Sequence, residues 1–130
     1  MKSFFGILAV LLLVGCASTW VDPRLNLRGT RIGVQCVDDP LGLAARIENL
    51  LRDASIETSP LGAKNAGDLV LRVTYKFKKS DSGVNSIQSV KAEMLDPRYH
   101  SQEGRYEWNG DGDTQDEAAQ KLVDALTARQ

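Results

Sequence analysis

The stretch Asp68-Leu-Val-Leu-Arg-Val-Thr-Tyr-Lys-Phe-Lys-Lys79 alternates between two kinds of side chain. Every second position is apolar or aromatic: Leu69, Leu71, Val73, Tyr75 and Phe77. The positions between them are mostly polar: Val70, Arg72, Thr74, Lys76 and Lys78. Because successive side chains of a strand point to opposite faces, this period predicts a β-strand with one face on a core. The other face would meet water or a partner.

Two further strands are expected on the carboxyl side of this stretch. Residues 84–95 predict an antiparallel partner strand, with its inward positions at Val90, Ala92 and Met94. Ile87 and Leu95 fall out of this phase, which a β-bulge would correct. Residues 104–109 predict the next strand, with Tyr106 and Trp108 on one face. Three consecutive strands joined by short turns predict an antiparallel meander.

Two helices flank these strands in the sequence. Asp39 and Pro40 predict a helix start, with Asp39 as the N-cap, and an apolar stripe follows at Leu43, Ile47, Leu50, Leu51 and Ala54. Thr114 and Glu117 have the spacing of a capping box, and the last helix then has its apolar face at Ala118, Leu122, Val123 and Leu126.

The resulting order of elements is β-α-(β)-β-β-β-α over residues 30–130, with the first strand at 30–37 and a short one at 56–58. We therefore expect a single α/β (α+β) domain, a two-layer sandwich with an antiparallel meander and both helices on one face of the sheet. The opposite face would carry Arg72, Thr74, Lys76 and Lys78.

Residues 1–15 have the features of a secretory signal peptide. Lys2 gives a positive start, and an apolar run of 11 residues follows from Phe4 to Val14. A membrane-spanning helix needs about 20 apolar residues, so this run is too short for one. The run ends in Leu13-Val14-Gly15-Cys16, and small residues come next.

This ending resembles the lipobox of bacterial lipoproteins. The resemblance implies that the peptide before Cys16 is removed and that Cys16 carries a diacylglycerol and an N-acyl chain, including palmitate. Ala17 stands where an aspartate would favour the inner membrane, which implies an outer-membrane protein facing the periplasm. Residues 16–29 would then be the lipidated cysteine and a tether, in which Trp20 either rests at the membrane interface or packs on the domain.

The order of elements over residues 30–128 also resembles a small domain of envelope proteins. Examples are the amino-terminal domain of the Tol system's propeller protein and the lipoprotein partner of the lipopolysaccharide translocon. The resemblance rests on Asp68–Val73 after a glycine-bearing loop and on Gly104–Trp108 before the segment 116–126. It implies an accessory or assembly role in the cell envelope and supplies no catalytic residue.

Motifs for catalysis or metal binding are missing from the sequence. It has no glycine-rich phosphate loop, no Cys/His metal spacing and no Gly-x-Ser-x-Gly motif. The acidic segment 109–113 does not fit an EF-hand, because the required Gly and Glu positions hold Thr114 and Gln120. A single histidine, His100, leaves few options for a catalytic triad. We expect no enzyme, no metal and no cofactor apart from the acyl chains.

The net charge and the number of cysteines further limit the kinds of partner that we expect. The chain has 16 Lys and Arg against 17 Asp and Glu, so a net charge of −1 gives no general attraction to nucleic acid. With Cys16 lipidated, Cys36 is the other thiol; it is either a small buried hydrophobe or a reactive or intermolecularly bonded cysteine.

The basic residues Arg72, Lys76 and Lys78 share one strand face, with Lys79 following and Lys91 on the next strand. They form either a solvated strand face or a contact for a partner or an anionic group.

The expected function is thus a non-enzymatic accessory or assembly factor with an envelope protein partner. The alternatives are a binding module for an anionic glycolipid or glycan resembling lipopolysaccharide and, less favoured, a hydrolase.

Overall fold

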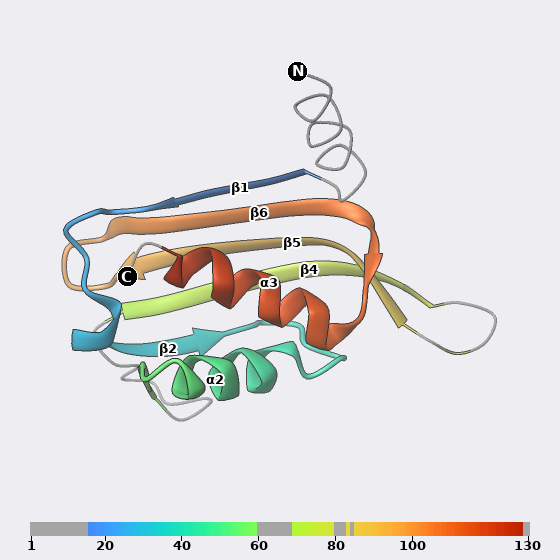
Figure 1. Cartoon of the computed structure of the whole chain (residues 1–130), viewed down its shortest axis with the longest axis horizontal. Coiled ribbons are helices and arrows are strands. Elements are labelled where there is room, and N and C mark those ends of the chain that lie inside the picture. Colours follow the sequence, from blue (N-terminus) through green and yellow to red (C-terminus); the bar gives the residue numbers. More distant parts are fainter. Residues whose placement is uncertain (1–15, 60–68, 80–82, 84, 129–130) are drawn as a thin grey trace, which may run out of the picture.

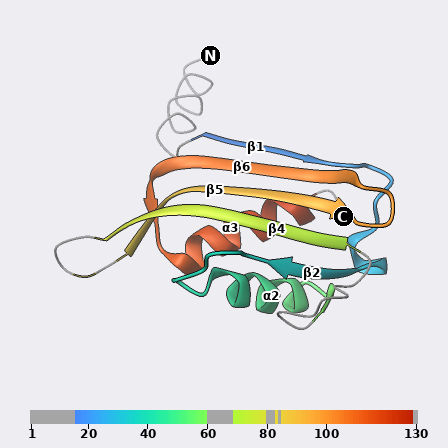
Figure 2. The same ribbon diagram turned by 180° about the vertical axis from the view of Figure 1, so that it is seen from behind.

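Six strands form one sheet, and two helices cover one of its faces (Figures 1 and 2). The computed structural model describes residues 16–59, 69–79, 83 and 85–128. The elements are β1 Cys16–Val21, the 3-10 helix η1 Leu27–Gly29, β2 Arg31–Gln35, α2 Leu43–Asp53, β3 Glu57–Thr58, β4 Leu69–Lys79, β5 Asn85–Asp96, β6 Ser101–Asp113 and α3 Gln115–Thr127. The expected two-layer α/β sandwich is confirmed.

The sheet order is β1-β6-β5-β4-β2-β3. Strands β4, β5, β6 and β1 are antiparallel neighbours, whereas β2 lies parallel to both β4 and β3. The three central strands are the antiparallel meander that the alternating sequence predicts. Helix α2 connects the parallel strands β2 and β3, and helix α3 follows β6 and packs beside α2.

The bulge expected in β5 is confirmed for Ile87 but not for Leu95. Ser89 lies opposite Lys76 and Ile87 lies opposite Phe77, so Gln88 is the extra residue. This extra residue returns Ile87 to the core side, where it is fully buried with Val90, Ala92 and Met94. Leu95 stays on the other face, opposite Val70.

The core lies between the sheet and the two helices. From the sheet it takes the buried side chains Ile32, Val34, Leu69, Leu71, Val73, Tyr106 and Trp108, and from the helices Leu43, Ile47, Leu51, Ala118, Leu122, Val123 and Leu126. An ion pair between Arg46 Nε and Asp116 Oδ1, at 2.6 Å, links the two helices at their exposed side. The apolar stripes expected for both helices therefore form this core.

The tether expected over residues 16–29 is wrong. Residues 16–21 form β1 along β6, Val21 is buried, and Leu27 is fully buried. The strand was not evident because six residues with mixed side chains carry little apolar periodicity, and their backbone partners come from β6. That strand is itself longer than the expected 104–109. The expected signal peptide, residues 1–15, lies outside the described residues.

The expected start of the first helix is wrong by three residues. Helix α2 begins at Leu43, and Gly42, with φ of 69°, occupies the position before it. Asp39 still caps the helix, because its carboxylate accepts hydrogen bonds from the backbone N–H groups of Leu43 (2.7 Å) and Ala44 (3.0 Å). The capping box of α3 is confirmed, with Thr114 and Glu117 each accepting the other's backbone N–H.

Candidate functional site

The sheet face that α2 and α3 leave uncovered, here called the outer face, is the first candidate surface (Figure 2). The strand register arranges its side chains in rows across the sheet. One row runs Trp20, Arg105, Glu93, Arg72, Gln35, and the next runs Ser18, Glu107, Lys91, Thr74. Opposite charges alternate along these rows, and Lys91 Nζ lies 3.8 Å from Glu107 Oε1. This part of the outer face is close to charge-balanced.

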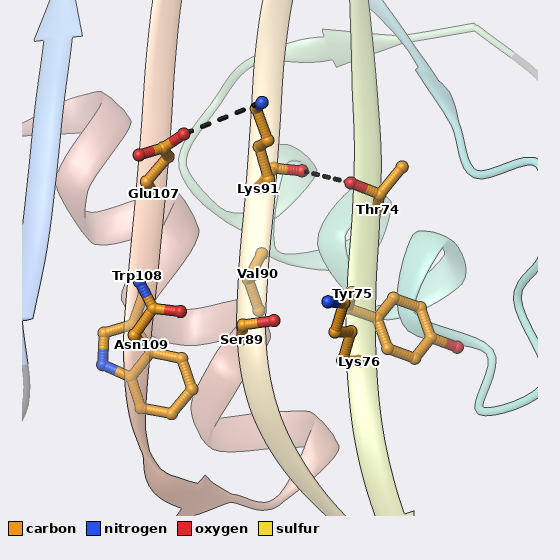
Figure 3. A pocket seen from close by; sticks show the side chains of 9 residues that line it. All are labelled: Thr74, Tyr75, Lys76, Ser89, Val90, Lys91, Glu107, Trp108 and Asn109. Atoms are coloured by element: carbon orange, nitrogen blue, oxygen red, sulfur yellow. Dashed lines mark hydrogen bonds and ion pairs between the residues drawn. The ribbon is translucent and has the colours of Figure 1, made fainter.

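A shallow depression of about 320 Å³ lies on the outer face across β4, β5 and β6. Figure 3 shows six polar side chains around it, Thr74, Lys76, Ser89, Lys91, Glu107 and Asn109, with Tyr75, Val90 and Trp108 from the same strands. Trp108 itself is buried, and Lys121 Nζ lies 4.9 Å from the centre of its ring. The depression offers hydrogen-bond donors and acceptors to a polar ligand.

The three basic residues singled out in the sequence all lie on the outer face of β4 and are exposed, but the register separates them. Arg72 lies opposite Glu93, so an acidic residue faces it across the strands. Lys76 and Lys78 lie opposite Ser89 and Ser86, which carry no charge. The unbalanced positive charge is therefore at the hairpin end of β4, where Lys79 is also exposed.

The predicted lipidation residue, Cys16, is the first residue of β1 and lies opposite Asn109 of β6. No part of the described chain separates it from the sheet. Trp20 lies four residues further along the strand, about 13 Å from Cys16, and is 45% exposed on the outer face. The structure thus places Trp20 within the sheet rather than in a flexible segment.

The outer edge of β1, which pairs with no other strand among the described residues, is a second candidate surface that sequence reasoning missed. The backbone N–H of Asp22 donates to Glu103 O at 2.9 Å. Because every second residue of an antiparallel strand bonds to its partner, the backbone groups of Trp20 and Ser18 also face β6. By that alternation, the backbone groups of Ala17, Thr19 and Val21 point away from β6. Residues 16–21 contain no charged residue and no proline, the devices that usually protect an edge. That uncharged run was the signal available in the sequence.

A small hollow lies beside this edge, on the helix side of the sheet. Its volume is about 250 Å³, and its lining residues come from β1 and the end of α3: Thr19, Val21, Ala125, Leu126 and Ala128. These are small or apolar side chains except for the Thr19 hydroxyl. A strand added beside β1 would place its own inward side chains over this hollow.

The partly buried polar cluster at the start of α2 is structural. Tyr75 donates its hydroxyl proton to Asp39 Oδ1 at 2.7 Å and accepts the backbone N–H of Leu41 at 3.0 Å. Burial and this bond to Asp39 raise the pKa of Tyr75. Burial alone would raise the pKa of Asp39, but the hydrogen bonds from Tyr75 and from backbone N–H groups outweigh it and lower the pKa. Each group is occupied in holding α2 to β4.

Cys36 lies beside this cluster and is partly buried. Burial first, and then the charges of Asp39 and Asp38, raise the pKa of its thiol to about 11. At neutral pH the thiol therefore stays protonated and is a poor nucleophile. Of the two interpretations of Cys36, this environment favours the inert, packed one.

Two further observations bear on chemistry. Among residues 16–59, 69–79, 83 and 85–128, no three His, Cys, Asp or Glu side chains are grouped as a metal site. In the same part of the chain, no helix is long and apolar enough to cross a membrane.

Comparison with known proteins identifies the fold. No protein-family model matches the sequence, and no curated protein matches it. The solved structures include two of the PelC dodecamer from Paraburkholderia phytofirmans. A single-substitution variant has a TM-score of 0.60 at 16% identity, covering 88% of this chain and 98% of that one. The other has a TM-score of 0.57 at 17% identity, with 89% and 96% covered.

Two other solved structures are more distant. A PDZ domain protein from Parabacteroides distasonis has a TM-score of 0.51 at 13% identity, covering 92% of this chain and 37% of that one. A minor lipoprotein from Acinetobacter baumannii has a TM-score of 0.46 at 12% identity, with 75% and 92% covered. At such identities the likeness concerns the fold alone, and the fold of this chain is similar to that of the PelC subunit.

Proposed function

We propose that this chain is a lipid-anchored, non-enzymatic accessory or assembly protein of the bacterial outer membrane, facing the periplasm. It acts through protein contacts at the outer edge of β1. The observation that carries the proposal is that edge: an uncharged strand with backbone groups pointing outward, beside a hollow of about 250 Å³.

Strand addition is the binding mode that such an edge favours. An extended partner segment gains backbone hydrogen bonds to Ala17, Thr19 and Val21, and pockets for alternate side chains give it specificity. The hollow between β1 and α3 is such a pocket, since Thr19 and Val21 form one of its walls. The backbone groups of β1 would thus give affinity for the partner segment, and the adjacent hollow would give selectivity for its side chains.

The membrane anchor belongs to the same edge. Cys16, the residue that the lipobox assigns to diacylglycerol and an N-acyl chain, is also the first residue of β1. Three acyl chains on one residue would hold the protein on the bilayer, because each buried CH₂ contributes about 0.8 kcal/mol. The partner is thus a protein of the envelope, and Ala17 favours the outer membrane.

A second copy of this chain is the first partner to test. The PelC structures are dodecamers, and PelC has a similar fold. Head-to-tail assembly of identical subunits needs two different surfaces on each copy. The edge of β1 would be one of these surfaces.

A structural role for the titratable groups supports a non-enzymatic function. Asp39 caps α2, while hydrogen bonds from Arg98 to Asp96 and from the Arg24 backbone to Asp22 lower the pKa of each of these two carboxyls. The raised pKa of Cys36 comes mainly from burial. Each of these four shifts, at Asp39, Asp96, Asp22 and Cys36, thus has a cause in local packing or capping.

The experiment is a crosslinked pull-down of the tagged, lipidated protein from intact envelopes, with light scattering of the Cys16→Ser chain to detect self-association. Thr19→Pro removes an outward N–H, whereas the control Thr19→Val keeps it. We expect Thr19→Pro to lose the partner while its melting curve stays cooperative, and Thr19→Val to retain it. Equal capture by both variants would overturn the proposed edge contact.

The anchor has its own test. Labelled palmitate should enter the wild-type protein and be absent from Cys16→Ser. Equal labelling of the two proteins would refute lipidation at Cys16 and leave the edge contact to be judged separately.

A binding module for an anionic glycolipid or glycan is the second candidate, favoured by the polar depression in Figure 3. Ser89→Leu with Asn109→Leu would fill it. Salt-sensitive binding of lipopolysaccharide by the Cys16→Ser chain, lost in this double variant, would support this candidate. Unchanged binding would exclude the depression as the site.

A further inference from the structure

We propose that the β4–β5 hairpin, by which we mean residues 76–79 and 85–89, docks on the anionic lipid headgroups of the bilayer that holds Cys16, and so fixes the orientation of the domain. The inference rests on the proposed anchor at Cys16. It commits to headgroups of that bilayer as the ligand, with the exposed lysines at the end of β4 as the contact.

The strand register brings the anchor and the hairpin to one end of the sheet. Cys16 lies opposite Asn109, Asn109 opposite Ser89, and Ser89 opposite Lys76. Three steps between neighbouring strands place Cys16 and Lys76 about 14 Å apart. Figures 1 and 2 show the start of β1, the end of β4 and the start of β5 at the same end of the sheet.

The hairpin extends beyond the anchor in that direction. Strand β1 runs from Cys16 toward the far end of the sheet, whereas β4 runs toward the anchored end and finishes at Lys79. Lys78 and Lys79 therefore lie about 7–10 Å past the row that contains Cys16. A bilayer surface at Cys16 is within reach of these side chains.

The charge of the hairpin suits an anionic surface. Lys76, Lys78 and Lys79 are exposed and lie opposite Ser89, Ser86 and Asn85, all uncharged. Asp81, between the two strands in the sequence, reduces the formal charge of residues 76–89 to +2. A lysine close to an anionic lipid surface is attracted to it, and this attraction falls off within a Debye length.

Among the acidic side chains that the structure describes at the same end, most are paired on the helix side. Asp113 forms an ion pair with Lys121 at 2.7 Å, and Asp116 forms one with Arg46 at 2.6 Å. Glu117 belongs to the capping box of α3. Asp38 is exposed in the segment before α2. The lysines are thus on β4, whereas these carboxylates are on the helices, before α2 or, for Asp113 of β6, turned toward Lys121 of α3.

Phe77 adds an aromatic group to the hairpin. It is 40% exposed although it belongs to the apolar face of β4. Aromatic side chains are favoured at the membrane–water interface, where their rings sit at headgroup depth. A basic and aromatic hairpin beside a lipidated residue combines two membrane signals.

Because the anchor is joined directly to the sheet, contact of the hairpin with the bilayer would set the orientation of the domain. Because β1 starts at Cys16, the acyl chains would hold the sheet by its end without an intervening tether. Hairpin contact would then keep the domain from rotating about Cys16. The β1 edge would be held in a fixed direction relative to the membrane.

The test supplies the anchor chemically. Residues 16–130 with Cys36→Ala are coupled through Cys16 to a maleimide headgroup lipid in phosphatidylcholine vesicles, with or without phosphatidylglycerol. Amine acetylation measured by mass spectrometry reports the exposure of each lysine, with Lys121 on α3 as internal reference. Failure of natural lipidation would appear in the palmitate experiment and would leave this one intact.

On anionic vesicles we expect acetylation of Lys76, Lys78 and Lys79 to slow about threefold relative to Lys121, and the effect to vanish at high salt. In the double variant Lys76→Glu/Lys78→Glu, Lys79 should lose this protection from acetylation. In the control double variant Arg28→Glu/Arg31→Glu, which makes an equal charge change at the opposite end of the sheet, Lys79 should stay protected. Equal acetylation on both vesicles, or equal loss in both double variants, would overturn the proposal.

Discussion

Asp39 connects three parts of the molecule through one carboxylate. Its oxygens accept the N–H groups of Leu43 and Ala44 at the start of α2 and the hydroxyl proton of Tyr75 on β4. We expect Asp39→Ala to lower the free energy of unfolding by about 1–2 kcal/mol, measured by urea denaturation at pH 7. The neighbouring exposed Asp38→Ala is the control and should change stability little.

The same residue predicts a pH dependence. The pKa of Asp39 in the folded state is below its ordinary value, so folding favours the charged form. Its contribution is therefore complete above the pKa of the unfolded chain, about 4, and is lost as pH falls through the folded pKa. The stability gap between wild type and Asp39→Ala should narrow between pH 5 and pH 3. A gap that stays constant would contradict this interpretation.

Cys36 predicts slow thiol chemistry. With a pKa of about 11, its thiolate fraction near pH 7.5 is about two orders of magnitude below that of an ordinary cysteine. In a Cys16→Ser chain, reaction with a disulfide reagent should be slow in buffer and fast in urea. A native rate equal to the unfolded rate would restore the reactive-thiol interpretation.

At the scale of elements, β6 has a close contact at Gly112. Its φ is 118°, and a Cβ there would collide with the Ser86 side chain of β5. Gly112→Ala should therefore lower the free energy of unfolding by about 2–4 kcal/mol. Gly83→Ala is the control, because Gly83 also has a positive φ, 82°, but has open space around it. Its loss of stability therefore measures the backbone strain without the collision. Ser86→Gly should recover part of the loss, and equal destabilisation by both alanines would exclude the collision.

Elements with a local sequence signal were predictable, and those that depend on a neighbour were not. The alternation of β4, the bulge that returns Ile87 to the core and the capping box at Thr114 can all be read within a few residues. The start of α2 was misplaced because Asp39 caps from outside the helix, across the Gly42 turn. Strand β1 was missed because β6 supplies its hydrogen-bond partners.

The candidate surfaces follow the same rule. The basic side chains of β4 were predicted from alternation, and they do lie on one exposed face. Their separation into a balanced Arg72 and an unbalanced hairpin depends on Glu93, Ser89 and Ser86 of β5, and hence on a register that a bulge shifts. The edge of β1 required both the strand and its position at the border of the sheet.

At the scale of the whole molecule, the first strand decides whether the anchor is rigid or flexible. A tether could be removed without effect on the domain, whereas β1 and the segment after it contribute Val21 and Leu27 to the core. Burying each of these side chains contributes about 1.5–3 kcal/mol. Together they are a large part of the roughly 5–15 kcal/mol that stabilises a small domain.

Truncation tests this directly. Three chains, residues 16–130 with Cys16→Ser, 22–130 and 30–130, differ in whether they contain β1 and Leu27. We expect the urea midpoint to fall at each step, with 30–130 close to unfolded in buffer, because β6 loses its partner strand and two core side chains are gone. Equal midpoints for all three would mean that residues 16–29 are a tether after all. The domain could then turn freely on its anchor, and neither the β1 edge nor the hairpin would have a fixed direction relative to the membrane.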